Sequence, residues 1–224
     1  MASFPDTSIF NSIEIADQRA EIGNIDASGK TYNRFLKQRW QLELQSIPLT
    51  TAQYQSIYPF LVQQNGESGV FTFQYPLNPM STKQDSLDYS SVNYKLARNG
   101  TTDALTKGST SYSNAYLADT VNNLGTGEGF LYSHDFIKFA NHSKVYKIAG
   151  ADSSGVTLFN ANTGVGSPSG NLNIYPALVE DVPIDTVITV YRPNFKVRLI
   201  GDVQSFETDI DGKFEIKMSL VEDY

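Results

Sequence analysis

Residues 38–73 read QRWQLELQSIPLTTAQYQSIYPFLVQQNGESGVFTF, and this stretch decides the fold. At its start, Trp40, Leu42 and Leu44 alternate with polar residues, as in a strand that buries one face. At its end, the segment from Val70 to Phe73 is rich in residues that favour strands. The residues between them carry helix signals, so the stretch predicts a strand, a helix and a second strand.

The helix signals begin with a capping box. Thr50 is the expected N-cap, and Gln53 follows three residues later, so that each side chain reaches the other residue's backbone N–H. Leu49 and Tyr54 are placed for a hydrophobic staple. Asn65-Gly66 ends the helix, with the glycine expected in the left-handed conformation. Apolar residues at helical spacing predict one apolar face: Tyr54, Ile57, Tyr58 and Leu61.

The remainder of the chain is dominated by strand patterns. Further strands are predicted at residues 12–15, 31–45, 92–97, 111–121, 130–132, 136–139, 144–149, 156–159, 172–175, 187–191, 195–200 and 213–221. Residues 1–11 are expected to be a mobile or docking arm, and residues 16–24 are ambiguous between a helical turn and a loop. The predicted fold class is mainly β with one short α-helix.

The strands fall into two groups. Those of the middle block are short and regularly spaced, which is typical of a small barrel or sandwich. The simplest architecture places the last strands in the same sheet as the opening stretch. We therefore predict a discontinuous sheet domain, residues 1–78 and 192–224, that carries an inserted β-barrel or sandwich domain, residues 79–191.

Composition and charge exclude several classes of function. The net charge is −7, from 17 basic and 24 acidic residues, and no basic run is present, so tight non-specific binding to nucleic acid is not expected. The absence of cysteine excludes disulfides, thiolate metal sites and a cysteine nucleophile. No segment has the length and apolarity of a membrane span, and the start MASFPDTS predicts no signal peptide.

Residues with catalytic or metal-binding potential do not form a site. Ser133-His134-Asp135 holds the three residue types of a triad, but neighbours on a strand point to opposite faces. His134 and His142 are the only histidines, and their spacing does not call for a metal. Asp209-Ile-Asp211-Gly212 predicts a hairpin turn rather than a calcium loop. Gly125 to Gly129 lacks the Lys-Ser/Thr of a phosphate loop.

We therefore predict no catalytic residue, no cofactor-binding residue and no metal ligand, and we expect that the protein is not an enzyme. By elimination, the residues favour a binding or assembly component.

The order of the pieces resembles a known family. Gln38-Arg39-Trp40 with its alternating strand, Pro48-Leu49-Thr50 at the start of a helix, and Val70 to Phe73 are similar to the start of tailed-bacteriophage minor tail proteins of the distal-tail type. Asn194 to Leu220 looks like their late hairpin. The segment from Gly129 to Ile148 looks like the paired strands of their inserted β-barrel.

The resemblance implies a tail-tube-like split sheet and a ring, usually hexameric, at the distal end of the phage tail. The implied partners are copies of the chain, the tail tube protein and the hub or baseplate proteins, with a tail fibre or receptor-binding protein at the inserted domain. DNA would only pass through the ring, and an acidic lumen would repel it. The implied location is the virion, after synthesis in the host cytoplasm.

Two alternatives stay open. A carbohydrate-binding module would present tyrosines of the inserted domain, such as Tyr112, Tyr116 and Tyr132, to a glycan. A glycoside hydrolase would need two carboxylates in a cleft, and no such pair stands out in the sequence.

Overall fold

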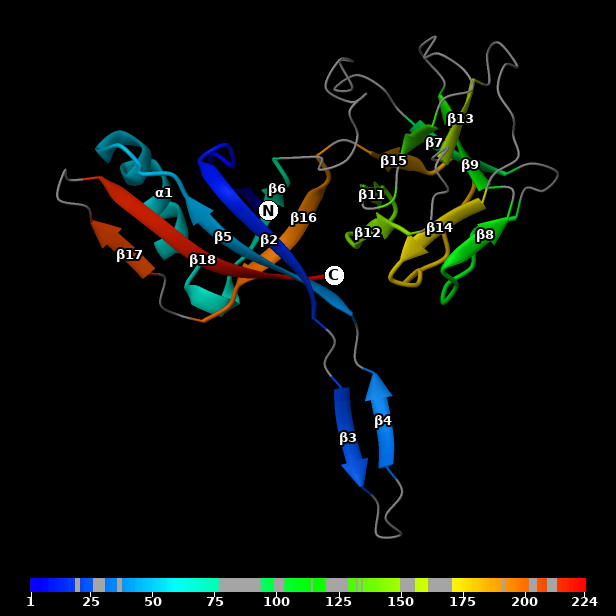
Figure 1. Cartoon of the computed structure of the whole chain (residues 1–224), viewed down its shortest axis with the longest axis horizontal. Helices are drawn as coiled ribbons and strands as arrows, with labels where there is room; N and C mark the ends of the chain where they lie inside the picture. Colours follow the sequence, from blue (N-terminus) through cyan, green and yellow to red (C-terminus); the bar gives the residue numbers. More distant parts are fainter. Residues whose placement is uncertain are drawn as a thin grey trace. The chain divides into compact units, whose positions relative to one another are not determined.

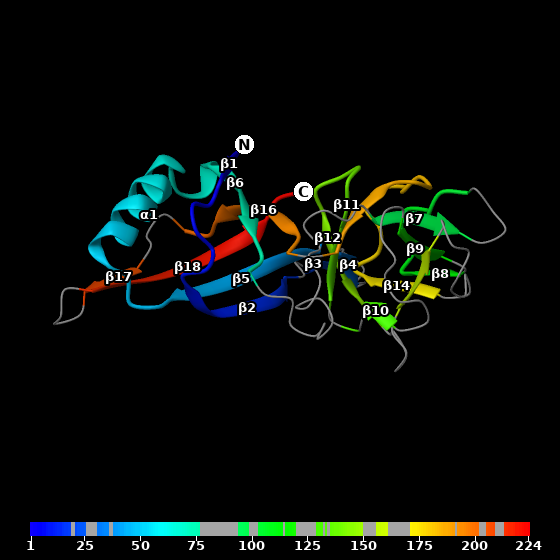
Figure 2. The same cartoon turned by 90° about the horizontal axis from the view of Figure 1, so that it is seen from above.

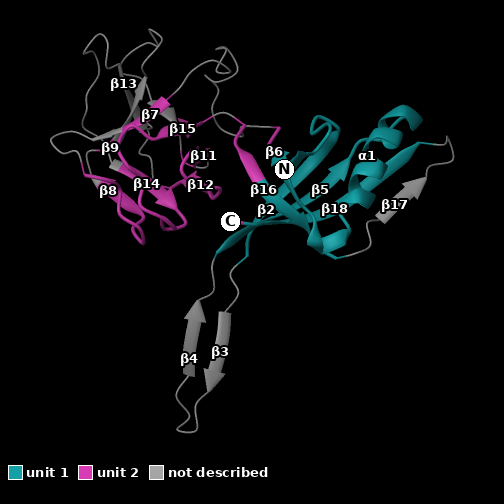
Figure 3. Ribbon diagram, turned by 180° about the vertical axis from the view of Figure 1, so that it is seen from behind, with its two compact units in different colours: residues 1–73, 196–223 teal, residues 74–195, 224 magenta. Residues whose placement is uncertain are grey.

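The computed structural model describes residues 1–18, 21–25, 31–35, 38–76, 94–98, 103–113, 115–119, 129–131, 133, 135–149, 156–160, 171–190, 192–201, 205–208 and 213–224. The chain forms two compact units (Figure 3). Unit 1 comprises residues 1–73 and 196–223, and unit 2 comprises residues 74–195 with Tyr224. The limits predicted from the sequence lie after residues 78 and 191.

Strands dominate both units, which confirms the predicted mainly β class with one short helix. The described residues hold eighteen strands, the α-helix α1 (Thr51–Gln63) and the short 3-10 helix η1 (Gly66–Ser68). Within those residues, no helix is both long enough and apolar enough to cross a membrane. The likeness to a tail tube stays a prediction.

Unit 1 is built on one sheet of seven strands (Figure 1). Six strands follow the order β1-β6-β16-β18-β5-β2, and β17 also pairs with β18. Their bounds are β1 Ala2–Ser3, β2 Phe10–Gln18, β5 Arg39–Ser46, β6 Val70–Gln74, β16 Asn194–Leu199, β17 Ser205–Thr208 and β18 Phe214–Glu222. The strands on either side of α1 thus share a sheet with the last strands of the chain, as the sequence predicts.

Strands β5 and β18 hold the apolar centre of this sheet. Their antiparallel register places Leu42 opposite Leu220 and Leu44 opposite Met218, and all four side chains are buried. Because side chains alternate along a strand, these residues share one face of the sheet. Trp40 continues the same face and is only 4% exposed.

Helix α1 lies along one side of the unit 1 sheet (Figure 2). Its N-terminus is closed by the predicted capping box. The Gln53 N–H donates to Thr50 Oγ1 at 3.4 Å, and the Thr50 N–H donates to Gln53 Oε1 at 3.0 Å. At the other end, Asn65 and Gly66 have φ values of 51° and 60°, so the left-handed turn includes the predicted glycine and begins one residue before it.

The buried face of α1 is narrower than predicted. Ile57 and Leu61 are buried, whereas Tyr58 is 41% exposed. Adjacent helix residues differ by about 100° around the axis, so Tyr58 turns away when Ile57 faces the sheet. The placement of Tyr58 on the buried face was therefore wrong.

The first eleven residues belong to the fold, so the prediction of a mobile or docking arm was wrong. Strand β1 pairs in parallel with β6, with Ala2 opposite Phe71. Phe4, Ile9 and Phe10 are buried. The ring of Phe4 contacts four aromatic rings at centroid distances of 5.5 to 6.3 Å: Phe10, Phe60, Phe71 and Phe73. These partners are mostly distant in sequence, which a local pattern cannot reveal.

Two predictions for residues 16–45 are also corrected. In the described part of residues 16–24, strands replace the expected helical turn or loop, because β2 continues to Gln18 and β3 covers Glu21–Ile25. The strand expected at 31–45, with a bend near residues 36–38, is described as two strands, β4 (Thr31–Phe35) and β5, with Gln38 in neither. Strand β3 pairs with β4 and β2 pairs with β5, both antiparallel. Cross-strand pairing, rather than local propensity, decides these residues.

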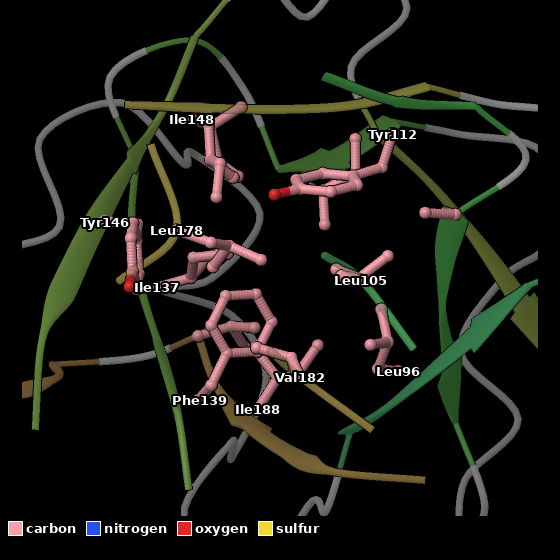
Figure 4. Close-up of a cluster of buried hydrophobic side chains, with 14 of the residues drawn as sticks. Leu96, Leu105, Tyr112, Ile137, Phe139, Tyr146, Ile148, Leu178, Val182 and Ile188 are labelled. Atoms are coloured by element: carbon pink, nitrogen blue, oxygen red, sulfur yellow. The ribbon is translucent and has the colours of Figure 1, made fainter. Parts of the chain in front are cut away.

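In the part of unit 2 that the structure describes, nine strands lie along one hydrogen-bonded path, β10-β13-β9-β7-β15-β11-β12-β14-β8 (Figure 1). Their bounds are β7 Tyr94–Arg98, β8 Ser111–Ser113, β9 Ala115–Asp119, β10 Gly129–Leu131, β11 Phe136–Phe139, β12 Val145–Ile148, β13 Val156–Asn160, β14 Asn171–Tyr175 and β15 Val187–Thr189. Strands β11 and β12 form the predicted antiparallel pair, with Ile137 opposite Tyr146. Their apolar side chains converge with those of neighbouring segments on one core (Figure 4).

The two ends of unit 2 are fastened to each other. The Tyr75 N–H donates to the Pro193 carbonyl oxygen at 3.3 Å. The rings of Tyr75, Phe136 and Phe195 pack edge to face, with centroids 5.5 to 6.2 Å apart. The chain therefore enters and leaves this unit at neighbouring points.

Candidate functional site

The triad-like run lies beside strand β11. Ser133 is half-buried and Asp135 is fully buried, while His134 lies outside the described residues. The backbone carbonyl of Asp135 accepts a hydrogen bond from the Ile148 N–H at 2.8 Å, which extends the β11–β12 pairing. The expectation that this run is not a triad stays a prediction.

His142 belongs to a structural hydrogen-bond network in unit 2. Its Nδ1 lies 2.9 Å from Asn141 Oδ1, and its Nε2 lies 2.7 Å from the Tyr146 hydroxyl. The same hydroxyl accepts from the Val179 N–H at 3.1 Å, and Asn141 Nδ2 donates to the Asp181 carbonyl at 3.0 Å. The network connects the turn before β12 to residues 179–181.

This arrangement favours a neutral imidazole. Amide Oδ1 only accepts, so Nδ1 carries the proton and Nε2 accepts from the tyrosine. Burial lowers the pKa of His142, as do the nearby charges of Lys138 and Lys144, while Glu180 opposes them. Within the described residues, no group of three or more potential ligands is placed to hold a metal ion.

One of the three tyrosines that the carbohydrate-binding alternative requires at the surface is buried in the structure. Tyr112 is only 5% exposed, and its hydroxyl lies 2.7 and 2.8 Å from the carbonyl oxygens of Thr106 and Ser109. Burial raises the pKa of Tyr112 to about 12. This ring fills the core of unit 2 and is not available for stacking on a sugar. The side chains of Tyr116 and Tyr132 lie outside the described residues.

Two other sequence motifs lie outside the described residues. They are residues 125–128 of the glycine-rich run and residues 209–212, where a hairpin turn is predicted. Strands β17 and β18, which flank the second of them, pair antiparallel with Thr208 opposite Phe214.

Strand β2 offers an open sheet edge. It is nine residues long and stands at the end of the strand order of unit 1. Within the described part of the chain, β5 is its one strand partner. Neither proline nor lysine, two residues that commonly block a sheet edge, occurs between Phe10 and Gln18, and the register with β5 is regular from Ser12 to Gln18 after a shift between Phe10 and Ser12. Its outer backbone groups suit pairing with a strand from another chain.

The side of the sheet opposite the apolar centre is polar and nearly balanced in charge. Glu14 and Glu43 face each other across β2 and β5. Gln41 Nε2 donates to Glu43 Oε1 at 2.7 Å, and the Ser219 hydroxyl donates to the other carboxylate oxygen. On β16, both basic side chains pair with one carboxylate. Lys196 Nζ and Arg198 Nη2 lie 3.3 and 2.7 Å from the oxygens of Asp223.

The outer side of α1 is the third notable surface of unit 1. Tyr58 is exposed and Val62 is 56% exposed, and Tyr54 lies four residues before Tyr58. Residues four apart lie on one side of a helix, so these three side chains form a stripe. The sequence signal for it was present, because no charged residue occurs between Glu43 and Glu67. The helical spacing of apolar residues predicted that Tyr58 is buried, and for this reason the exposed stripe was not predicted.

Comparison with known proteins identifies no family for this chain. A scan against models of protein families matches none, and a search of curated proteins finds no match. The features that bear on function are therefore the order of the elements and the three surfaces of unit 1: the β2 edge, the polar sheet face and the outer side of α1.

Proposed function

We propose that this chain is a structural subunit of a phage tail, which assembles with copies of itself into a ring at the distal end of the tail. In this role it joins the tail tube to the hub or baseplate proteins, and DNA passes through the ring without specific binding. The proposed location is the virion. A hexamer is the symmetry that the family resemblance implies.

The order of elements in the unit 1 sheet carries the proposal. Strand β5, helix α1 and strand β6 follow one another in sequence, and β16 and β18 complete the same sheet after unit 2 has intervened. Strand β18 pairs with β5 from Gln41 to Gln45. This order, a strand–helix–strand start with the last strands of the chain in the same sheet, supports the proposal because the resemblance implies it.

The open edge at β2 supports self-assembly. In a closed ring each subunit presents two different surfaces to its neighbours, and a sheet edge is a natural one of the pair. Among the described side chains, the polar sheet face carries Glu14, Glu43, Glu215 and Asp223 against Arg39, Lys196, Arg198 and Lys217. Because these charges balance, we do not assign the acidic lumen to this face.

The test is the mass and shape of the purified full-length protein. Sedimentation velocity gives the number of copies, and electron microscopy of the same sample gives the symmetry. The proposal predicts a closed ring with a central opening. A monomer at every concentration, which also fails to form rings with the tail tube protein, would contradict the proposal.

A matched pair of variants tests the edge. Ser12 and Ala16 are exposed on β2, and their register partners on the inner strand β5 are Gln45 and Gln41. Lysine on an edge strand hinders pairing with another strand, so Ser12→Lys with Ala16→Lys is expected to abolish the ring. The control, Gln45→Lys with Gln41→Lys, adds the same charge on the neighbouring inner strand β5, and this variant is expected to form the ring.

A further inference from the structure

Helix α1 presents a stripe of large side chains to solvent. Four large apolar residues are exposed among those that the structure describes, and two of them, Tyr58 and Val62, lie on this helix. With Tyr54 they form the α1 stripe, in which each residue follows the previous one by four positions. Scattered apolar residues are normal on a protein surface, but a continuous row on one helix is a feature of contact surfaces.

The aromatic part of the α1 stripe is held in place. The Tyr54 ring stacks on Phe214 with centroids 4.2 Å apart and an interplanar angle of 16°. It also stacks on Tyr58 at 5.3 Å and 19°. Phe214 is in turn bound to Leu49 by two backbone hydrogen bonds of 2.7 and 3.2 Å. Rings that are already ordered lose little conformational entropy when a partner covers them.

The helix carries no charge. None of the residues from Thr51 to Gln63 is acidic or basic, although 18% of the chain is charged. A helix that faces solvent normally carries charged residues on its outer side. Depletion of charge together with enrichment in tyrosine marks the cores of protein–protein interfaces.

We infer that the α1 stripe is a docking surface for a second copy of this chain. The inference rests on the proposed function, because it specifies one of the surfaces by which copies associate. Each copy has a net charge of −7, so two copies repel one another wherever their charged surfaces meet. An uncharged face avoids that repulsion and needs no desolvation of charged groups.

The chemistry of the stripe also fits a copy better than a charged partner. An acidic or basic partner would lose hydration at its charges, and the helix itself, which lies in the charge-free segment between Glu43 and Glu67, would offer it no opposite charge. The same face of a second copy brings aromatic rings, which pack on rings, and this two-fold contact lies between copies of two rings rather than between neighbours within one ring. Gln55 and the tyrosine hydroxyls can both donate and accept hydrogen bonds, so copies can pair with each other.

The test compares two adjacent positions on the full-length chain. Val62→Glu places a charge in the stripe, whereas Gln63→Glu places the same charge in the same helical turn but about 100° around the axis. Both side chains are exposed, so both variants are expected to fold, which circular dichroism checks. Sedimentation velocity over a concentration series should show self-association weakened at least about tenfold by Val62→Glu and unchanged by Gln63→Glu.

A neutral variant separates contact from charge. Tyr58→Ser removes an exposed ring without adding charge and is also expected to weaken self-association. If the wild-type chain associates and Val62→Glu and Tyr58→Ser associate equally well, the inference is wrong while the proposed ring stands. If Val62→Glu abolishes a dimer but no closed ring ever forms, the inference holds and the proposed function fails. A wild-type chain that stays monomeric overturns the inference.

Discussion

Truncation of the single tryptophan tests whether the opening stretch holds the core of unit 1. Trp40 lies on β5 opposite Asp17 of β2, and its side chain is almost completely buried. Its backbone N–H donates to Glu222 Oε2 at 3.3 Å, and this bond survives substitution of the side chain. Trp40→Ala therefore removes packing of the indole and leaves the backbone pairing intact.

The expected loss of stability follows from the area that the indole buries. An aromatic side chain of this size buries about 200 Å², which at about 25 cal/mol per Å² corresponds to roughly 5 kcal/mol. The Cβ atom stays in the variant, and neighbouring side chains relax partly into the space. We therefore expect the free energy of unfolding of unit 1 to fall by about 4 kcal/mol, within the range of roughly 3–5 for aromatic truncations.

The assay is denaturant unfolding followed by far-ultraviolet circular dichroism. Fluorescence cannot serve, because Trp40 is the only tryptophan of the chain. Trp40→Phe is the control and should lose clearly less stability, because it keeps a ring in the same space. A loss below about 1 kcal/mol in Trp40→Ala would show that the indole is not a core anchor, since surface substitutions commonly stay within that range.

Three further substitutions test local features. Thr50→Ala removes the capping box and should lower stability by about 1 kcal/mol in denaturant unfolding, and Thr50→Ser should retain most of it. Pro59 lacks the N–H that would bond the carbonyl of Gln55 inside α1, so Pro59→Ala should raise the melting temperature, and an unchanged or lower value would contradict this reasoning. Burial lowers the pKa of His142, so the unfolded chain takes up the proton at higher pH than the folded chain. The stability contribution of this residue is therefore complete above about pH 6.5 and declines as the pH falls below it. The melting temperature is measured near neutral pH and at about pH 5. Its decrease between these two pH values should be smaller for His142→Gln than for the wild-type chain.

The parts of the fold that the sequence predicted correctly depend on residues close together in the chain. Thr50 and Gln53 are three positions apart, and their mutual hydrogen bonds require no knowledge of the rest of the molecule. The alternation on β5 and β18 likewise shows which side of each strand is buried. The prediction that these two strands share one sheet was correct because both carry a long apolar alternation that needs a partner.

The errors concern contacts between distant residues. The arm prediction failed because Phe4 is buried against the ring of Phe71, which lies more than sixty positions later. Tyr58 was misplaced because apolar spacing describes a broad face, while the sheet covers only the part around Ile57 and Leu61. The charge-free sequence alone does not identify the outer surface of α1. The exposure of Tyr58 and Val62 in the structure is also needed.

The fastening of unit 2 at its ends explains how the unit 1 sheet tolerates a long insertion. Strands β6 and β16 are neighbours in the sheet, yet about 120 residues separate them, and closing a flexible loop of that length costs roughly 4 kcal/mol. Once unit 2 is folded, the hydrogen bond from Tyr75 to Pro193 and the three packed rings hold its ends together. The loop that the sheet must close is then a few residues long. Folding of unit 2 thus lowers the entropy loss of completing unit 1, and substitutions at Phe136 or Phe195 act on both.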